Sequence, residues 1–227
     1  RNADLVIIAA NLGSYKSIIA VLNKVISANA LIVEIGSVKQ YPERLFGKFL
    51  RYPQNFVATH PIAGSEKSGS GEIIENLYVG KKLYITTKTN YQTERIKKFW
   101  QVIGMQPEYI TASKHDRIFA EISHFPQLLA HEIKELLGPG KLQELRESGD
   151  ESVIKTLRLC DSNPRMWEEI YEYNEEALEK VQIKFSECSD DIKLSDLSNI
   201  QQKFKAFRQE LKTSNQEADI VIISLIY

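Results

Sequence analysis

The sequence is poor in cysteine and lacks both long hydrophobic runs and an excess of charge of either sign. Its two cysteines, Cys160 and Cys188, form neither a CxxC pair nor a metal-ligand spacing, so we expect reduced thiols and no metal site. No apolar run reaches the roughly 18 residues of a membrane-spanning helix, and the first residues lack the layout of a signal peptide. These absences predict a cytoplasmic protein that does not bind a membrane.

The charges are nearly balanced, with 29 basic and 30 acidic residues and a net charge of -1. This balance gives no reason to expect a nucleic acid as the partner. The hydrophobic share of 43% and the charged share of 26% are typical of a globular protein with a real core. The length of 227 residues allows one large or two ordinary domains.

The glycine-rich fingerprint of dinucleotide-binding folds, GxGxxG between a strand and a helix, is also missing. The Gly69-Ser70-Gly71 segment has no third glycine and follows no predicted strand, and Gly138-Pro139-Gly140 ends a predicted helix. The sequence opens on a strand of the buried type, whose edge would otherwise be open to aggregation. We therefore expect that the first half of the sheet lies outside this sequence or that another element covers the edge.

The first half of the chain alternates between two kinds of pattern. Continuous apolar runs typical of strands buried on both faces occur over residues 5–10 and 31–35, and shorter strands are predicted over residues 56–59, 82–87 and 107–111. Apolar residues at helical spacing predict a helix over residues 17–26, and further helices are predicted over residues 42–49 and 93–103. This alternation predicts an α/β domain over residues 1–111, a partial Rossmann-like parallel sheet.

From Ser113 onward the pattern is helical, which predicts an all-α domain over residues 112–227. Ser113 is a candidate N-cap, and Asp116 would lie in the first turn, where a carboxylate suits the helix dipole. Pro126 interrupts the apolar face that follows and, because it has no N–H, predicts a kink. His124 lies beside this kink, where a histidine hydrogen-bonded within the core is the alternative to a functional one.

The glycines at 138 and 140 predict the end of that helix. Further helices are predicted over residues 142–146, 152–159, 164–184 and 195–211. The final segment, residues 220–227 (IVIISLIY), is very apolar, and we expect it to be buried against a second subunit.

Polar side chains gather at the ends of three successive predicted strands. His60 precedes Pro61, which disfavours helix in the residue before it, so the imidazole should lie at a strand tip, a suitable place for a general base. Asn11 ends the first strand, and Ser37 and Lys39 follow the second. Ligands of such sheets bind beyond the carboxyl ends of the strands, which favours a site here. A histidine that only caps a turn is the alternative.

Five segments in order resemble the prephenate dehydrogenase family, which includes arogenate and cyclohexadienyl dehydrogenases. They are DLVIIAANLG at 4–13, EIGSVK at 34–39, THPIAGSEKSG at 59–69, HDRIFAEISHFPQ at 115–127 and RLCDSNPRMW at 158–167. The resemblance implies a dinucleotide-binding domain followed by a helical domain that forms a homodimer. It also implies oxidative decarboxylation of prephenate to 4-hydroxyphenylpyruvate in tyrosine biosynthesis, with NAD as cofactor and NADP as the alternative.

The resemblance further implies roles for individual residues. His60 would act as the base on the substrate hydroxyl, and Ser37 would orient that hydroxyl and the nicotinamide. Arg158 would hold a substrate carboxylate through its bidentate fork; without the family match it would be interpreted as a surface ion pair. The other substrate-binding candidates are His124, Gln127 and Ser65, and the candidates for the nicotinamide half of the cofactor are Ala10, Asn11, Gly36, Ser37 and Lys39.

Three departures from the family pattern keep alternatives open. The missing glycine fingerprint predicts poor cofactor affinity if this is the whole chain. Gln127 stands where many prephenate-using members have a second histidine, so arogenate is the alternative substrate, and Asn11 stands where a proline is usual. A remnant without activity that keeps the dimerising helical domain is the second hypothesis. A dehydrogenase of another small acid is the third, although the helix lysine of such enzymes has no match here.

Overall fold

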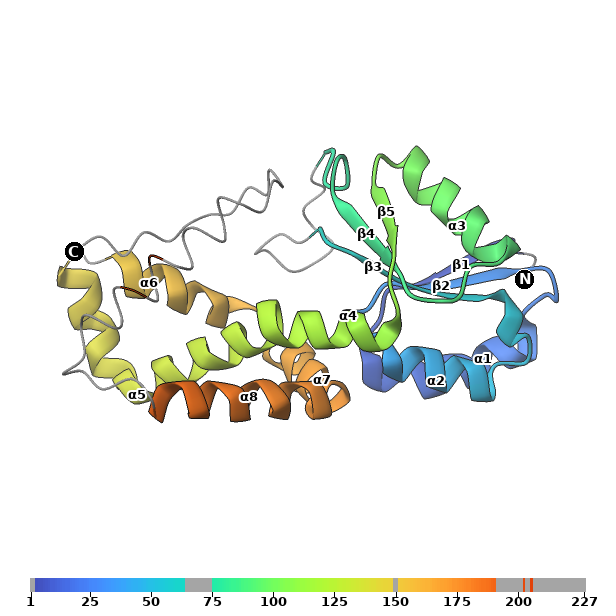
Figure 1. Cartoon of the computed structure of the whole chain (residues 1–227). Coiled ribbons are helices and arrows are strands. Elements are labelled where there is room, and N and C mark those ends of the chain that lie inside the picture. The colour runs from blue at the N-terminus through green and yellow to red at the C-terminus, as the bar shows by residue number, and fades with distance from the viewer. Residues whose placement is uncertain (1–2, 64–74, 149–150, 191–201, 203–204, 206–227) are drawn as a thin grey trace.

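The computed structural model describes residues 3–63, 75–148 and 151–190, together with residues 202 and 205. Five strands form one sheet in chain order, and helices cover both of its faces (Figure 1). The strands are β1 (Leu5–Ile8), β2 (Leu31–Glu34), β3 (Phe56–Pro61), β4 (Lys82–Ile85) and β5 (Gln106–Tyr109). The predicted α/β fold class is confirmed, and all five predicted strands are present with small differences at their ends.

One strand pair departs from the parallel arrangement that the sequence predicts. β1, β2 and β3 are parallel, as are β4 and β5, but β3 and β4 are antiparallel. The backbone N–H of Ile62 donates to the carbonyl of Lys82 at 2.8 Å, so β4 returns directly beside β3. An antiparallel neighbour needs no crossover helix, which is why the alternation of strands and helices fails at this point.

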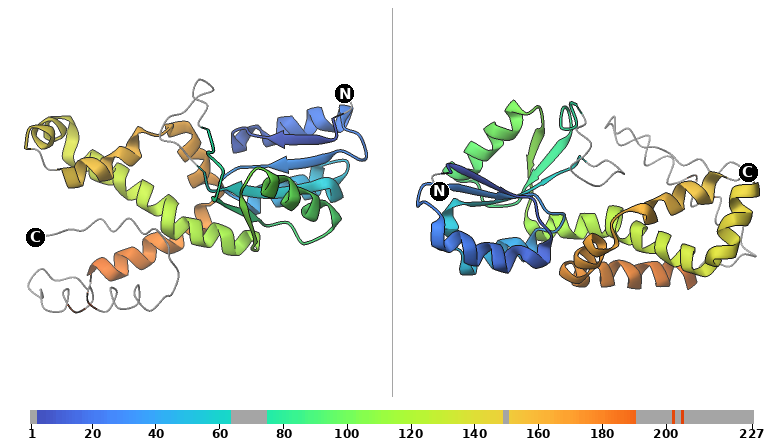
Figure 2. Two further views of the ribbon diagram at one scale, coloured as in Figure 1. Left: turned by 90° about the horizontal axis from the view of Figure 1, so that it is seen from above. Right: turned by 180° about the vertical axis from the view of Figure 1, so that it is seen from behind.

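The two faces of the sheet bury different helices. The helical elements of this half are η1 (Leu12–Ser14), α1 (Tyr15–Val25), α2 (Gln40–Phe49), η2 (Pro53–Asn55) and α3 (Tyr91–Val102). α1 and α2 lie on one face and α3 on the other (Figures 1 and 2). Ile32 packs with Phe46 in the first of these layers, and its neighbour Val33 belongs to the cluster of Trp100 in the second. Burial on both sides explains the continuous apolar runs of the central strands.

Residues 112–190, in the part that the structure describes, are helical and extend away from the sheet (Figure 2). Its elements are α4 (Ala112–Phe119), the π-helical turn η3 (Ala120–His124), α5 (Phe125–Ser148), α6 (Glu151–Leu157), the 3-10 turn η4 (Arg158–Asp161), α7 (Pro164–Tyr173) and α8 (Glu175–Asp190). Within the described ranges, no helix combines the length and apolar character needed to cross a membrane.

The start of α4 differs from the sequence prediction, and a π-helical turn lies just before Pro126, where a kink was predicted. Thr111, and not Ser113, caps α4, because its hydroxyl accepts the backbone N–H of Lys114 at 3.2 Å. Just before Pro126 the helix widens into the π-helical turn η3. Such a turn accommodates a residue that cannot donate a backbone hydrogen bond, and π-turns are frequent at functional sites.

Two helix breaks complete the layout. Gly138 adopts a positive φ of 67° with ψ 171°, so α5 consists of two helical pieces that meet at the predicted glycine break. The single helix predicted over residues 164–184 is wrong, because Asn174 ends α7 and separates it from α8. The predicted helix over 195–211, apart from residues 202 and 205, and the apolar segment 220–227 lie outside the described residues.

Candidate active site

His60 lies at the end of β3, as the sequence predicts, and its imidazole is held by groups from α4. Its Nδ1 lies 2.8 Å from Nε2 of His115. The ring also packs against Phe119, with ring centroids 4.8 Å apart. The side chain is partly buried. β3 therefore supplies the histidine, and one face of α4 fixes its position.

His115 and Asp116 continue this contact into the interior. Nδ1 of His115 lies 2.8 Å from Oδ1 of Asp116, and both side chains are fully buried. The His115 ring stacks on Phe119 with centroids 4.4 Å apart and meets the edge of Tyr84 at 5.9 Å. The result is a line of three hydrogen-bonding side chains, His60, His115 and Asp116, in which aromatic rings lie against the central His115.

Asp116 also caps a helix of the other half. Its Oδ1 accepts the backbone N–H of Lys39, and its Oδ2 accepts that of Gln40, both at 2.8 Å. These N–H groups belong to the first turn of α2, where the helix dipole favours a negative charge. The sequence places Asp116 in the first turn of its own helix, but the structure uses it to join α4 to α2.

Lys39 does not reach the exposed strand ends at which the sequence places it. Its side chain is fully buried and its ammonium is bound to the carboxylate of Glu34 and, at 2.6 Å, to the carbonyl of Thr59. The other oxygen of Glu34 accepts hydrogen bonds from the Tyr15 hydroxyl at 3.0 Å and from the Gly36 N–H at 2.9 Å. Lys39 is thus part of a buried network beneath the strand ends, away from any surface where it could touch a cofactor.

The surroundings keep the three neighbouring histidines neutral. Burial lowers the pKa of His60 well below its usual range, and the nearby charge of Lys39 lowers it further. Burial likewise lowers the pKa of His115, against the opposing effect of its hydrogen bond to Asp116. The pKa of His124 falls to about 4, chiefly through burial. Burial raises the pKa of Glu34, and the charge of Lys39 opposes this shift. Burial lowers the pKa of Lys39, and the charge of Glu34 opposes that shift.

His124 is buried in η3 and is tied to the break between α7 and α8. The side-chain amide of Asn174 donates to Nδ1 of His124 and to the carbonyl of Asp116, at 2.9 Å in each case. The His124 ring also lies near Phe119 and meets Trp167 edge-on. Phe119 therefore contacts the rings of His60, His115 and His124, which makes them one cluster.

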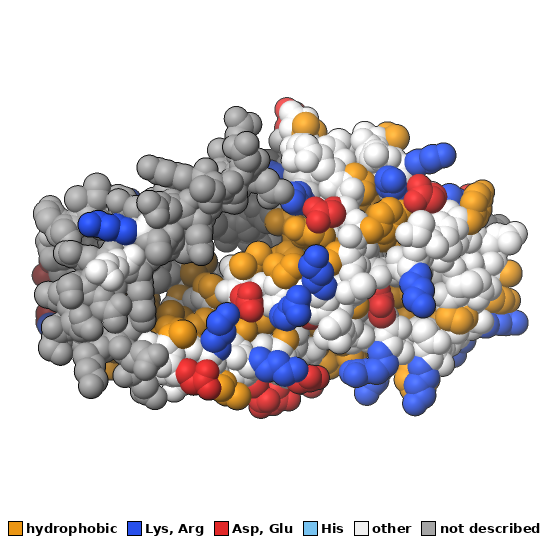
Figure 3. All heavy atoms as spheres, viewed as in Figure 1, with side chains coloured by type: hydrophobic (Ala, Val, Ile, Leu, Met, Phe, Trp, Pro, Cys, Tyr) orange, Lys and Arg blue, Asp and Glu red, His pale blue; other side chains and the backbone are white. Residues whose placement is uncertain are grey.

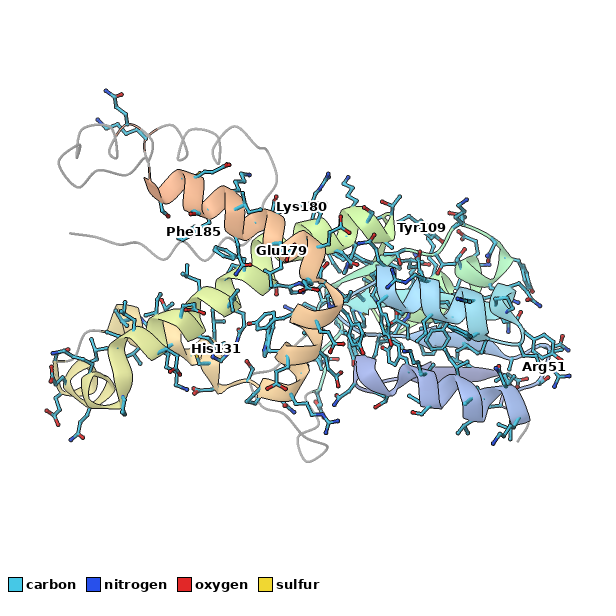
Figure 4. All side chains as sticks on the ribbon, turned by 90° about the horizontal axis from the view of Figure 1, so that it is seen from below. Arg51, Tyr109, His131, Glu179, Lys180 and Phe185 are labelled. Atoms are coloured by element: carbon cyan, nitrogen blue, oxygen red, sulfur yellow. The ribbon has the colours of Figure 1, made fainter. Side chains whose placement is uncertain are left out.

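Gln127 and Arg158 lie farther along the helical half. The amide of Gln127 donates to the carbonyl of Leu159 at 2.5 Å and to the hydroxyl of Ser162 at 3.1 Å, and it lies 3.3 Å from Nε2 of His131. Gln127 is buried, so its hydrogen bonds hold η4 from the interior side of the turn. Arg158, the first residue of η4, is exposed. Figure 4 labels His131, which marks this part of α5.

The remaining predicted residues lie at the ends of β1 and β2. Ala10 and Asn11 are exposed, and Ser37 and Gly36 are partly buried. A Cβ atom at Gly36 would lie 2.9 Å from the hydroxyl of Tyr15, so the glycine is required by packing against the buried network. Ser65 lies outside the described residues.

The helical run from α4 to α5 links the part of the predicted site on the sheet to the part on the helical half. His60 contacts Phe119 at one end of this run, and η4 contacts Gln127 at the other. On the face shown in Figure 3, hydrophobic side chains gather near the middle of the molecule, above a row of charged side chains. Among the described residues, no group of three or more histidine, cysteine, aspartate or glutamate side chains is placed to hold a metal ion.

A cleft lies between α2, α4 and α8. This cleft of about 530 Å³ is lined by both basic and acidic side chains, including Arg44, Arg117, Glu172 and Lys180. Lys180, labelled in Figure 4, is already paired with Glu176 at 2.6 Å. None of the residues predicted from the sequence to act in the site lines this cleft.

Comparisons with known proteins agree with this arrangement of two halves. Residues 1–107 match the family model described as the nucleotide-binding domain of prephenate dehydrogenase, and residues 111–213 match the one described as its dimerization domain. The chain belongs to the prephenate dehydrogenase family. The resemblance inferred from the five segments is therefore confirmed.

Relatives in other organisms are distant. The chain is 29% identical to the prephenate dehydrogenase of Bacillus subtilis, over 65% of this chain and 41% of that protein. It is 24% identical to the cyclohexadienyl dehydrogenase of Zymomonas mobilis, over 78% of this chain and 62% of that one. The chain thus spans about two to three fifths of the length of these curated relatives.

Among solved structures, prephenate dehydrogenase from Aquifex aeolicus, in complex with hydroxyphenyl propionate and NAD+, superposes with a TM-score of 0.78. The identity is 28%, and the alignment covers 92% of this chain and 74% of that one. The shared fold extends over both the sheet half and the helical half.

Sequence reasoning missed three residues that build the site. His115, Asp116 and Asn174 make hydrogen bonds that hold His60, His124 and α2 in place, and none was a candidate. The signal for the first two was the His-Asp pair at the start of an otherwise apolar helix face, within a segment that resembles the family. Asn174 gave no signal, because it lies within a continuous helical pattern.

Proposed function

We propose that the protein catalyses the oxidative decarboxylation of prephenate to 4-hydroxyphenylpyruvate, with NAD as hydride acceptor. The observation that carries this proposal is the neutral His60, held at the end of β3 by the buried His115 and Asp116. A base of lowered pKa at the end of a strand suits removal of a hydroxyl proton at neutral pH.

The chemistry balances with one base. His60 accepts the proton of the ring hydroxyl as the hydride leaves the same carbon, which pushes electron density toward the departing hydride. Loss of CO2 then makes the ring aromatic, and His60 returns the proton to the phenolic oxygen. The products are 4-hydroxyphenylpyruvate, CO2 and the reduced cofactor, and no further oxidant is required.

The residues at the strand ends fit the nicotinamide half of the cofactor. Asn11 offers an exposed amide and Ser37 a partly buried hydroxyl, groups that can hydrogen-bond a carboxamide. NAD supplies hydride acceptance when bound. The sequence contains no GxGxxG for the pyrophosphate, so this part of the proposal concerns the nicotinamide half alone. Lys39 is buried, so its proposed effect on the cofactor site is indirect, through its charge and its ion pair with Glu34.

The helical half supplies the proposed substrate contacts. Arg158 binds a carboxylate of the substrate, since a guanidinium fork matches a carboxylate in charge and geometry. Gln127 supports this arginine by holding the next residue, Leu159. His124, at the end of η3, and Ser65, which lies outside the described residues, are the other proposed substrate contacts.

Turnover tests the proposal directly. The protein is mixed with NAD and either prephenate or arogenate, and the absorbance of the reduced nicotinamide is followed. We expect turnover with prephenate; a preference for arogenate would favour that alternative, for which the neutral Gln127 is the relevant feature. Folded protein that binds prephenate but forms no reduced cofactor, with NAD or with NADP, would favour the remnant without activity.

We further propose that the protein acts as a cytoplasmic homodimer whose domains divide near residue 111. The family model described as a dimerization domain supports the dimer, and the change of family model between residues 107 and 111 supports the division. Both cysteines are free, which is typical of a reducing compartment. Size measurement in solution by light scattering tests the dimer.

A further inference from the structure

We propose that His115 and Asp116 are positioning residues that fix the tautomer of His60, with the proton on Nδ1 and the accepting lone pair on Nε2. This inference rests on the proposed function for its kinetic consequence, but the tautomer itself is a property of the folded protein. It assigns the atom that accepts the substrate proton, which the position of His60 alone leaves undetermined.

The argument begins at Asp116, the inner end of the line. Both carboxylate oxygens accept backbone N–H groups from the start of α2, with each distance 2.8 Å. An ionised carboxylate has only acceptors, and it suits the positive end of a helix dipole. The third group at this carboxylate, Nδ1 of His115, must therefore be a hydrogen-bond donor.

His115 then has one proton and one lone pair to place. It is fully buried against Phe119, and its lowered pKa favours the neutral imidazole. Because the proton is on Nδ1, Nε2 has the lone pair and can only accept. The atom that faces this lone pair at 2.8 Å is Nδ1 of His60, which must donate.

His60 is consequently the Nδ1–H tautomer. A neutral imidazole has one proton, so Nε2 carries the lone pair and is the base. The rings cannot turn freely to exchange these roles, since His60 packs on Phe119 and His115 lies between Phe119 and Tyr84. A second group that orients the base is a recurring arrangement in sites of proton transfer.

Nitrogen NMR tests the tautomer without reference to activity. The protein is labelled with ¹⁵N-histidine, and the four histidines are assigned by single substitutions. We expect His60 to show a protonated Nδ1 and an unprotonated Nε2 at neutral pH, and the same pattern for His115. A protonated Nε2 on His60 would overturn the inference, whether or not the protein turns over prephenate.

Kinetics test the consequence for the reaction. His115→Phe keeps a ring between Phe119 and Tyr84 and leaves the cap of α2 in place, but removes the acceptor for His60. We expect kcat to fall roughly tenfold or more, part of the 10²–10⁴-fold that proton transfer supplies, with KM little changed. In the same variant the Nε2–H form of His60 should appear by NMR.

Two further variants separate positioning from packing. His115→Gln retains an acceptor for His60 and a donor for Asp116, so it should recover most of the lost rate and the Nδ1–H signal. Tyr84→Phe keeps the ring that touches His115 and removes only a hydroxyl, so its rate should match the wild type. Equal kcat for His115→Phe and the wild type would contradict the inference. A His60→Asn variant with unchanged kcat would instead contradict the proposed function.

Discussion

The two ends of the site are held in opposite ways. On the sheet side, His60 is supported by side chains that are fully buried and hydrogen-bonded, among them His115 and Asp116. On the helical side, Arg158 lies exposed on a short 3-10 turn, which Gln127 holds through the neighbouring carbonyl. The base is fixed by buried hydrogen bonds, whereas the candidate group for the substrate anion is an exposed side chain at the start of a short turn.

Because of this difference, substitutions near His60 and substitutions near Arg158 should have different effects on rate, stability and substrate affinity. Substitutions of the buried polar residues near His60, such as Lys39 or Asp116, disturb buried charges. They should therefore lower both the free energy of unfolding and the reaction rate. Changes to the exposed Arg158 side chain on η4 should change substrate affinity while leaving the fold intact. The variants below test each end of this comparison, from the largest expected effect to the smallest.

The buried ion pair beneath the strand ends should give the largest effect. Lys39→Met leaves the Glu34 carboxylate buried without its partner, and breaking such a pair costs about 3–5 kcal/mol of stability. Urea unfolding measures the loss. The matched control is Lys82→Met, which removes the exposed ion pair with Glu108 and should cost about 1 kcal/mol or less. Similar losses in both variants would show that burial does not distinguish the pairs.

The neutral histidines should make the fold sensitive to acid. For His124, whose pKa is about 4 when folded and 6.5 ordinarily, the unfolded chain binds the proton first as the pH falls. Stability is therefore full above pH 6.5 and declines toward pH 4, by about 3 kcal/mol for this shift. His60 and His115, whose pKa values are also lowered, add to the decline in the same direction.

His124→Gln checks the contribution of this one residue. Glutamine can still accept the hydrogen bond from Asn174, but it carries no charge at any pH. Urea unfolding at several pH values should show a flatter decline below pH 6.5 than in the wild type. A decline of unchanged steepness would mean that His124 does not stay neutral in the folded protein.

Replacing the base should lower the rate without removing the substrate. His60→Asn is expected to reduce kcat by about 10²-fold, equivalent to about 2.7 kcal/mol, with a small change in KM. Steady-state formation of reduced cofactor from prephenate measures both constants, and thermal unfolding verifies the fold. A rate within a factor of two of the wild type would remove His60 from the mechanism.

The sequence predicted the layers of the fold well because burial on both faces leaves a local signal. The run at β2 gave the strand to within one residue, Leu31–Glu34, and the glycine at 138 gave the break in α5. The antiparallel β4 and the division at Asn174 were not predictable in this way. Each depends on hydrogen bonds to distant segments, Ile62 to Lys82 and Asn174 to Asp116, which leave no periodic trace.

The site was predictable only where a residue leaves a signal in its own stretch of sequence. His60 stood out because Pro61 follows it at a strand end, and the structure places it there. Lys39 was assigned to the cofactor because it follows a strand end, but Glu34, five residues earlier, draws its ammonium into the interior. The sequence did contain a signal for this burial, because Glu34 is a carboxylate within the apolar strand run at residues 31–35. The roles of Ser37, Arg158 and the other candidates in binding stay predictions.

The exposed end of the site should give the smallest effect and the most selective one. Arg158→Ala removes a charge-assisted contact to a substrate carboxylate, worth about 1.5–3 kcal/mol, so KM for prephenate should rise about tenfold or more. The affinity for NAD and the midpoint of urea unfolding should change little, because the side chain is exposed on η4. Arg158→Lys keeps the charge without the fork and should recover only part of the affinity. Isothermal titration with prephenate and with NAD separates the two binding steps. Equal losses for both ligands would show instead that η4 supports the whole domain, and the contrast between a fixed base and an adjustable substrate contact would fail.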